Sequence, residues 1–372
     1  MSLPARLVTT LDAPLGRATA DAPYVLRPPG RRLFVQHGDT EAVAYDLDEL
    51  IAGTEKAEAV RFPAPWRRRL GPCAVSPERD LAVFSGTHAL RAVDADGRAR
   101  WEIRHGCWDA GCRESHSSVE EYVDRGDHRY PDRGSAVFSA DGTLVWAHVR
   151  TPLAADGPDA EETEEWLVID AADGRVLGRV DTCTAVHGSV HVPHPDPGRM
   201  GLTLGEGQDG VPLYWGRWDG EKLTADRVGN DDRVLLDVGP SGDRFLTVTH
   251  YQETLALHRT EDYSVVAELD ADSAVPRHPD AESEGDGHDE HEPGWDYEGG
   301  FLDEDTAIAG TSWTDDESGA ARHWLVDLAH LRVTGHVAYP IRVFGPPRPL
   351  GDGTWYTLSE TGDALHVWAL SG

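Results

Sequence analysis

A turn followed by a run of apolar residues recurs seven times along the chain. Each turn combines Pro, Ser or Asp with Gly or an acidic residue, and strand-forming residues such as Leu81-Ala82-Val83-Phe84 follow at once. The turns lie at residues 29–30, 77–78, 141–142, 197–198, 241–242, 303–305 and 352–353. This pattern predicts seven hairpins, each opening one copy of a repeated unit.

The spacing of the turns predicts a β-propeller. Successive turns lie about 44 to 63 residues apart, against roughly 40 to 50 residues in one propeller blade. A second apolar run and turn follow most copies, as at residues 89–103 and 166–180, which gives four strands per blade. We therefore predict an all-β fold, a single domain over residues 1–372 that forms a seven-bladed propeller of four-stranded antiparallel blades.

The N-terminal segment is expected to close the ring. The last copy supplies only about three strands before the chain ends, whereas residues 5–11 form a strand-like segment without a partner in the first copy. Pairing the two would complete the last blade and protect the edges of its sheet.

Two segments resemble known propeller repeats. Residues 92–101 are similar to quinoprotein-type repeats, and residues 362–372 are similar to the end of a WD40 repeat. This resemblance to WD40 and quinoprotein-like repeat propellers covers nearly the whole chain at the level of blade geometry, and it implies the fold rather than an activity. The Trp-Asp dipeptides do not keep a regular WD40 register, and seven copies instead of eight argue against a pyrroloquinoline-quinone enzyme.

Composition narrows the range of partners. The formal net charge is -32, so we expect neither nucleic acid nor an anionic membrane surface as a partner, because both require basic patches. No apolar run approaches the roughly 20 residues of a membrane span, and the N-terminus lacks a secretory signal. A cytoplasmic location is therefore expected, and four cysteines in so long a chain do not form a disulfide scaffold.

Three insertions interrupt the repeat, and the order of strands in a blade predicts that all three lie on one face. They cover residues 105–132, 151–165 and 271–298, and together they carry more than half of the net negative charge. Such a rim would attract cations toward the central channel, since loops on a rigid scaffold commonly carry binding sites. The alternative is that these acidic loops only keep the protein solvated.

The first insertion contains a candidate metal site. His105, Cys107, Cys112 and His116 bring imidazoles and two thiolates within one loop, the donor set that zinc-like ions prefer. The spacing of the two cysteines fits only a loose zinc pattern. A disulfide or redox pair, and ordinary loop residues, are the other two interpretations.

A second group of residues is expected to bind a ligand at the mouth of the channel. Histidines on several predicted loops could converge on the axis, where they would suit a divalent metal or acid-base catalysis, and nearby aromatics could surround a cationic group. The residues are His37, His88, His187, His250, Tyr251, Trp295, Asp296, Tyr297 and Trp313. A structural role, in which each histidine bonds to a neighbouring blade, is the alternative.

Two functional hypotheses follow. The first is a binding propeller that receives a cationic protein, peptide or small molecule on its acidic, histidine-bearing face. The second is a lyase or hydrolase whose cofactor, a divalent metal ion, lies at the channel mouth. Nucleophile elbows, metalloprotease helices, haem-attachment motifs and dinucleotide fingerprints are all missing from the sequence, so no catalytic residue is assigned.

Overall fold

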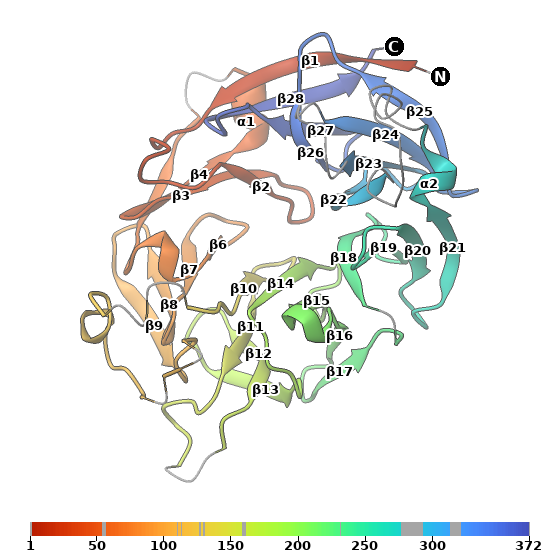
Figure 1. The fold of residues 1–372 in the computed structure, drawn as a ribbon. Coiled ribbons are helices and arrows are strands. Elements are labelled where there is room, and N and C mark those ends of the chain that lie inside the picture. The colour runs from red at the N-terminus through yellow and green to blue at the C-terminus, as the bar shows by residue number, and fades with distance from the viewer. Residues whose placement is uncertain are drawn as a thin grey trace. The chain divides into compact units, whose positions relative to one another are not determined.

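The computed structural model describes residues 2–53, 57–109, 111–112, 114–125, 128, 131–157, 161–230, 232–276, 293–312 and 321–371. The chain divides into two compact units, Pro14–Asn230, called the first unit, and Met1–Ala13 with Asp231–Gly372, called the second unit. Strands dominate both units, and the helices are short (Figure 1). None of the described helices has the length and apolar character needed to cross a membrane.

The first unit contains four antiparallel sheets, each made of four strands in chain order. The strands of the first two sheets are β2 (Tyr24–Leu26), β3 (Leu33–His37), β4 (Glu41–Asp46) and β5 (Val60–Pro63), then β6 (Cys73–Val75), β7 (Leu81–Ser85), β8 (Ala89–Asp94) and β9 (Ala99–Arg104). The strands of the next two are β10 (Ala136–Phe138), β11 (Leu144–Arg150), β12 (Glu164–Asp170) and β13 (Val176–Asp181), then β14 (Gly188–Pro193), β15 (Arg199–Gly205), β16 (Leu213–Trp218) and β17 (Leu223–Arg227). Helix α1 (Leu47–Ile51) and 3₁₀ helices at Arg68–Leu70, Val119–Glu121 and Gly207–Asp209 lie in the connections.

The second unit contains one four-stranded sheet and one eight-stranded sheet. The four-stranded sheet is β18 (Arg233–Val238), β19 (Arg244–Thr249), β20 (Thr254–Arg259) and β21 (Val265–Asp270), after which helix α2 (Ala271–Ala274) follows. The larger sheet contains β22 (Gly294–Phe301), β23 (Thr306–Ser312), β24 (Arg322–Asp327) and β25 (Arg332–Ala338), with β26 (Phe344–Pro349), β27 (Thr354–Leu358), β28 (Ala364–Leu370) and β1 (Ser2–Asp12).

The seven predicted turns are confirmed as hairpins. Each one joins the first two strands of a four-stranded meander, from β2 and β3 in the first sheet to β26 and β27 in the last. The turns depend on local residues, because a glycine such as Gly142 or Gly242 adopts a positive φ at the point where the chain reverses. Repeated four-stranded antiparallel meanders are the architecture of a β-propeller. The number of seven blades stays a prediction.

The N-terminal strand pairs as the sequence predicts, and it extends further. β1 runs antiparallel to β28 from Ala5 opposite Leu370 to Asp12 opposite Ala364. Its first residues, Ser2 to Pro4, also pair in parallel with β25, and this joins two meanders into the eight-stranded sheet. β1 thus supplies the fourth strand of the last meander, and closure of a complete ring stays a prediction.

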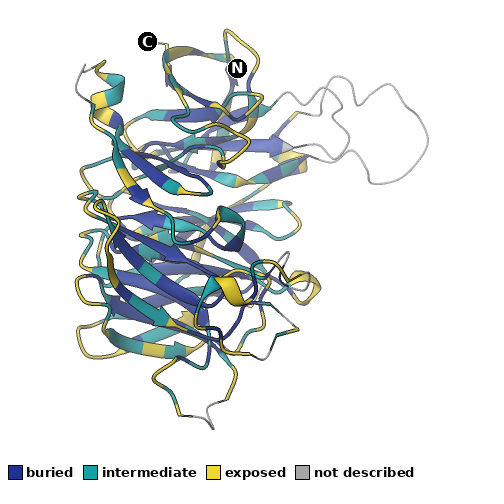
Figure 2. Cartoon of the chain, turned by 90° about the vertical axis from the view of Figure 1, so that its left-hand side faces the viewer, coloured by how far each residue is buried: buried dark blue, intermediate teal, exposed yellow. Residues whose placement is uncertain are grey.

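The core lies between successive sheets. Among the described residues, four of the five buried apolar clusters are each shared by two sheets that follow one another in the chain, three in the first unit and one in the second. The fifth is shared by the two meanders that β1 joins into the eight-stranded sheet. Figure 2 shows buried residues along the strands and exposed residues mainly in the connections. In one cluster Trp146 and Trp166 from the third sheet pack against the fourth sheet, where Gly216 in β16 leaves room for both rings.

The insertions interrupt the meanders where the sequence places them, with corrections at their ends. Residues 105–132 separate β9 from β10, and residues 151–165 separate β11 from β12, which already begins at Glu164. The third insertion ends earlier than expected, because β22 begins at Gly294. Residues 277–292 of that insertion lie outside the described residues. Their placement with the other insertions on one face stays a prediction.

The packing of Gly216 gives a test of the inter-sheet core. A Cβ atom at this position would lie 2.6 Å from the Trp166 ring and 2.7 Å from the Trp146 ring. We expect Gly216→Ala to lower the free energy of unfolding by about 1–3 kcal/mol, the usual cost of overpacking a rigid core. Urea unfolding followed by tryptophan fluorescence measures it. Gly188→Ala is the control, because its Cβ would have no atom within 4 Å, and an equal loss in both variants would contradict the prediction.

Candidate functional site

Four metal-capable side chains of the first insertion lie together. The ligand atoms of Cys107, Cys112, His116 and His128 are all within 4.8 Å of one another, and this group is called the Cys-His cluster. The Nε2 atom of His128 lies 3.3 Å from the Cys107 Sγ, and the Nε2 atom of His116 lies 3.3 Å from the Cys112 Sγ. Cys107 and both histidines are buried, whereas Cys112 is half-buried. All four cysteines of the chain are free thiols.

The cluster differs in one member from the set expected from the sequence. His105 is not part of it, because its Nδ1 atom faces the carbonyl oxygen of Gly106 at 2.7 Å. His128 takes that place, although it lies 16 residues beyond Cys112 in the chain. Membership of the same insertion was the one sequence signal for His128. Burial raises the pKa of the Cys107 thiol to about 12, with the neighbouring Cys112 adding to the effect.

Tyr122 forms the base of the cluster and connects it to the second sheet. Its ring stacks on His128 with the centroids 5.0 Å apart, and it contacts His116 at 4.8 Å. Its hydroxyl lies 2.6 Å from the Nδ1 atom of His88, in the turn between β7 and β8. Burial lowers the pKa of His88 to about 4, so this imidazole is neutral at pH 7. His88 therefore anchors Tyr122, and with it the loop, to the second sheet.

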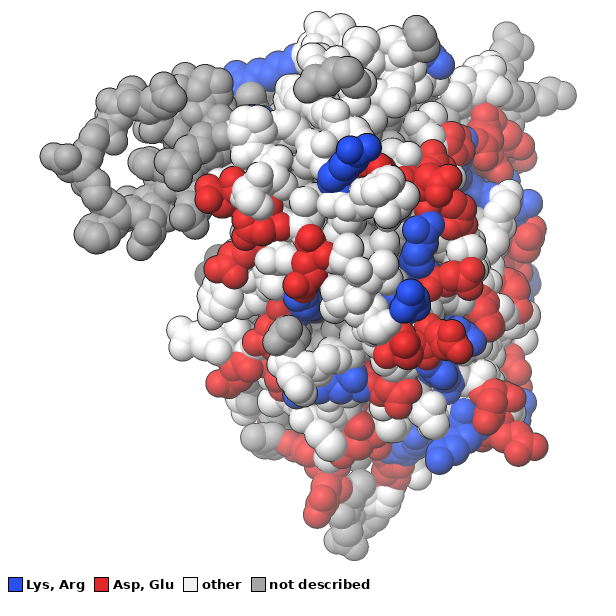
Figure 3. Space-filling model, turned by 90° about the vertical axis from the view of Figure 1, so that its right-hand side faces the viewer, with Lys and Arg blue, Asp and Glu red and all other residues white. Residues whose placement is uncertain are grey.

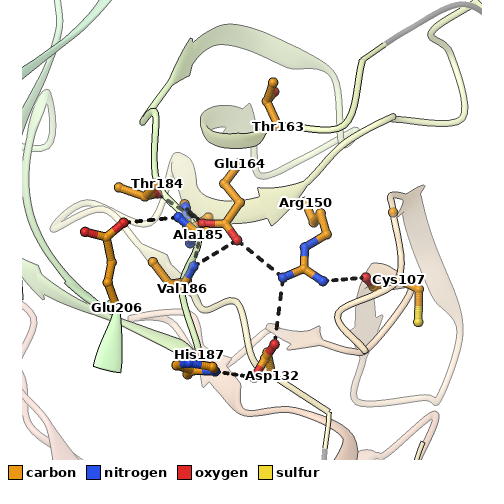
Figure 4. Close-up of polar contacts among 12 residues, drawn as sticks. Cys107, Asp132, Arg150, Thr163, Glu164, Thr184, Ala185, Val186, His187 and Glu206 are labelled. Carbon is orange, nitrogen blue, oxygen red and sulfur yellow. Dashed lines mark hydrogen bonds and ion pairs between the residues drawn. The ribbon is translucent and has the colours of Figure 1, made fainter. Parts of the chain in front are cut away.

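Arg150, the last residue of β11, holds both ends of the first insertion. Its guanidinium donates to the Cys107 carbonyl oxygen at 3.1 Å and lies 3.8 Å from the Asp132 carboxylate (Figure 4). The same group lies over the Trp108 ring, 4.9 Å from its centroid. Because Cys107 and Asp132 lie at opposite ends of the insertion, one side chain closes its base.

Glu164 supplies the buried counter-charge for Arg150. One carboxylate oxygen accepts from Arg150 Nη2 at 3.4 Å, and the carboxylate also accepts from the Val186 amide at 3.1 Å and the Thr184 hydroxyl at 3.0 Å (Figure 4). Burial raises the pKa of Glu164, and these hydrogen bonds and the guanidinium oppose that rise. The network joins the insertion to the segment between the third and fourth sheets.

The other predicted histidines of the first unit are separate from one another. His37 is buried beside the Phe84 ring at 5.6 Å, and burial lowers its pKa to about 4. His187 is exposed, and its Nδ1 atom lies 3.0 Å from the Asp132 carboxylate. Across the described residues, the Cys-His cluster is the one group of three or more such side chains with metal-ligand proximity. The expected convergence of His37, His88 and His187 is therefore not found.

In the second unit, the loop between β19 and β20 and the start of β22 form a tyrosine-bearing surface. The backbone carbonyl of Gln252 accepts a hydrogen bond from the Trp295 amide at 2.7 Å. The side-chain amide of Gln252 donates a hydrogen bond to the Trp295 carbonyl at 2.9 Å. The Tyr297 hydroxyl donates to the His250 carbonyl, and the His250 ring contacts Tyr251 at 5.3 Å. We call His250, Tyr251 and Tyr297 the tyrosine patch. Tyr251 is 79% exposed and Tyr297 is 42% exposed.

Tyr297 lies on a bulge in β22. Trp295 pairs with Thr311 and Gly299 pairs with Ala309, so Asp296, Tyr297 and Glu298 all lie opposite Gly310. Gly310 permits the bulge, because a Cβ atom there would lie 2.0 Å from the Asp296 carboxylate. Bulges of this kind redirect side chains and are common next to functional sites. The carboxylate of Glu298 pairs with Arg348 from β26.

One of the predicted aromatics does not join the tyrosine patch, and another is not described. Trp295 is fully buried in the core between two sheets, and its Nε1 donates to the Leu269 carbonyl at 3.0 Å, which corrects its expected place on the surface. Trp313 lies outside the described residues. Asp296 is half-buried, with its carboxylate next to Gly310, and Glu253 is exposed beside Gln252. Acidic side chains occur over much of the face drawn in Figure 3, with Lys and Arg between them.

Comparisons with known proteins show a similarity of fold only. The chain matches no protein-family model and no curated protein sequence. Similar solved structures include U3-55K, with 9% identity, a TM-score of 0.54 and 98% of both chains covered. The RRP9 WD40 repeats share 9% identity and a TM-score of 0.52, with 99% of this chain and 97% of that chain covered. The Kuenenia stuttgartiensis hydrazine synthase shares 12% identity and a TM-score of 0.53, with 95% and 97% covered.

These likenesses confirm the predicted β-propeller and its resemblance to WD40-type repeats at the level of the fold. Identity this low carries no information on activity, because one fold supports many unrelated functions. The function must therefore be argued from the sites of this chain.

The Arg150–Glu164 pair gives a test of how the first insertion is anchored. Arg150→Met leaves a buried carboxylate without its guanidinium, so we expect the free energy of unfolding to fall by about 3 kcal/mol. Adding Glu164→Gln should restore part of this loss, because it removes the unpaired charge. Urea unfolding measures both. Arg61→Met breaks an exposed pair with Glu41 and serves as the control, with an expected loss below about 1 kcal/mol; no recovery in the double variant would contradict the prediction.

Buried neutral histidines predict a loss of stability in acid. Burial lowers the pKa of seven histidines to about 3 or 4: His37, His88, His105, His148, His191, His258 and His323. Between pH 6.5 and those values the unfolded chain binds protons that the folded chain does not, so each histidine lowers the free energy of unfolding by up to about 1.4 kcal/mol per pH unit as the pH falls. Glu164, with its raised pKa, acts in the opposite direction as a single group.

We therefore expect the urea midpoint to fall steadily from pH 7 to pH 5, with the imidazole resonances of these residues still in the neutral form in the folded protein. A midpoint that stays level or rises over this range would show that these histidines are protonated in the fold.

Proposed function

We propose that the protein is a partner-binding β-propeller that receives a cationic segment of another protein on the tyrosine patch. The observation that carries the proposal is the exposure of Tyr251 and Tyr297, which both contact His250. Exposed tyrosines contribute large contact areas at low entropic cost, and they are enriched at protein interfaces.

The rigidity of the patch supports recognition. Gln252 holds the turn against β22 through two hydrogen bonds, and it adopts a positive φ of 64° that brings Tyr251 to the tip. The Tyr297 hydroxyl is held in place by its hydrogen bond to the His250 carbonyl. A partner would thus meet two aromatic rings that need little further ordering, and preorganisation of this kind favours affinity.

Charge selects the class of partner. Glu253 is exposed beside the patch, and the segment that precedes β22 in the sequence, residues 278–292, is rich in Asp and Glu and contains no Lys or Arg. The whole chain carries a net charge of -32, which would steer a basic segment toward it. Lys and Arg side chains are also the groups that bind the faces of tyrosine rings.

The alternative of a metal-dependent enzyme has no observation in its favour. It required imidazoles from several blades at one point, whereas His37, His88 and His187 contact Phe84, Tyr122 and Asp132 respectively.

A basic peptide tests the proposal. The probe is an Arg/Ser repeat peptide, compared with the same peptide in which citrulline, the neutral isostere, replaces arginine. We expect the combined Tyr251→Ser and Tyr297→Ser variant to bind the arginine peptide about tenfold more weakly in calorimetry, because the ring faces are lost. Combined Tyr251→Phe and Tyr297→Phe should retain most of the affinity.

Val266→Ser is the matched control, since Val266 is an exposed residue on the outer strand β21 of the same unit. Equal binding of the arginine and citrulline peptides would remove the cationic partner from the proposal. Unchanged affinity in the double serine variant would remove the tyrosine patch.

A further inference from the structure

The Cys-His cluster has the donor set and the proximity of a metal centre in a part of the molecule that the proposed function does not use. It lies in the first unit, within the 105–132 insertion, whereas the tyrosine patch belongs to the second unit. We propose that Cys107, Cys112, His116 and His128 bind one Zn²⁺ ion as a closed, structural site.

The distances fit tetrahedral zinc. Zinc lies about 2.3 Å from cysteine sulfur and about 2.0–2.1 Å from histidine nitrogen, so a tetrahedral ion separates a sulfur from a nitrogen by about 3.6 Å. The Cys107–His128 and Cys112–His116 pairs lie at 3.3 Å, and all four ligand atoms fall within 4.8 Å. Both histidines present the same atom, Nε2, to the cluster.

Contacts around the cluster support the same assignment. The amide of Asp109 points at the Cys107 Sγ at 3.4 Å, and the amide of Glu114 points at the Cys112 Sγ at 3.4 Å. Such N–H donors stabilise the negative charge of a metal-bound thiolate. The Nδ1 atom of His116 lies 3.3 Å from the Glu121 carboxylate, the arrangement that fixes the orientation of a zinc-bound histidine.

The donor chemistry favours zinc and a structural role. Two sulfurs and two nitrogens suit a tetrahedral zinc ion, and hard cations such as Mg²⁺ and Ca²⁺ prefer oxygen ligands. Four protein ligands leave no open position for water or substrate, as in structural rather than catalytic zinc sites. A metal bound here would tie the interior of a long insertion in which regular structure is short, as in the 3₁₀ helix Val119–Glu121, while Arg150 closes its base.

The first experiment measures the metal content of the protein, which is purified without chelators and kept under reducing conditions. Mass spectrometry of metals should find about one zinc per chain in the parent protein. Cys107→Ser, Cys112→Ser and His128→Gln should each lower the zinc affinity by more than the roughly 10–100-fold that the loss of an outer-shell partner costs, so each should lose most of its bound zinc. Cys183→Ser is the matched control, because Cys183 is exposed and lies outside the cluster.

His105→Gln separates the two possible ligand sets. It should keep its zinc, whereas His128→Gln should lose it. Loss of zinc in His105→Gln with retention in His128→Gln would overturn the assignment of ligands. Zinc retained by the combined Cys107→Ser and Cys112→Ser variant would show an adventitious ion only.

A second measurement does not depend on variants folding. The parent protein is stripped with a chelator under reducing conditions and refilled with Co²⁺, which should give the visible bands of a tetrahedral ion and a thiolate-to-cobalt charge-transfer band. Mg²⁺ should not displace it. Stripped protein should be cut by protease within residues 105–132, and zinc should restore protection. Absence of a cobalt spectrum, or recovery of Cys107 and Cys112 as a disulfide from unreduced protein, would overturn the proposal.

Binding of the arginine peptide serves as a separate readout. Because the tyrosine patch lies in the second unit, the zinc-free variants should bind this peptide as the parent does. Failure of the zinc site would thus leave the proposed function intact, and failure of peptide binding would leave the zinc measurements intact.

Discussion

The face-to-face packing of successive sheets is the interaction on which the rest of this structure depends. A four-stranded meander has two apolar faces and cannot bury them alone, so each sheet is stable only when a neighbour covers it. Every buried cluster of the described residues is shared by two meanders that follow one another. The fit is close, because Gly216 must lack a side chain for the Trp146 and Trp166 rings to pack against β16.

Because this packing stabilises the strands, the connections are free to vary in length. The 105–132 insertion is long for a segment with so little regular structure, and such loops are commonly functional or need their own anchors. Here the anchors are polar and local: Arg150 at the base, and Tyr122 beneath the Cys-His cluster. Burying Arg150 with Glu164 is costly unless every group is paired, and the Val186 amide and Thr184 hydroxyl complete that pairing.

The two candidate sites differ in their exposure to solvent. The Cys-His cluster is closed and largely buried, so its chemistry acts on the protein's own loop. The tyrosine patch is open to solvent. Part of it lies on the β22 bulge, where three residues opposite Gly310 leave the regular pairing with β23. Most of the described histidines belong to neither site. His191, for example, lies in the core, with one ring nitrogen 2.7 Å from the Ser135 hydroxyl and the other accepting from Trp166.

The sequence by itself determined the features that depend on local chemistry. Turn residues with positive φ and the apolar runs that follow them are encoded within a few positions, so all seven hairpins were predictable. The spare strand near the N-terminus was predictable for a related reason, because an incomplete last meander requires one. The insertions were visible as interruptions of the period, and Cys107, Cys112 and His116 were visible as neighbours within one loop.

Only the tertiary structure decided which residues meet. His128 rather than His105 completes the cluster, because the path of an irregular loop depends on its contacts with Tyr122 and Arg150 and not on a period. Trp295 is buried and Tyr297 is exposed, because the start of β22 and the bulge opposite Gly310 are set by the neighbouring strand. Local patterns fix the strands and turns, whereas contacts between distant segments fix the sites.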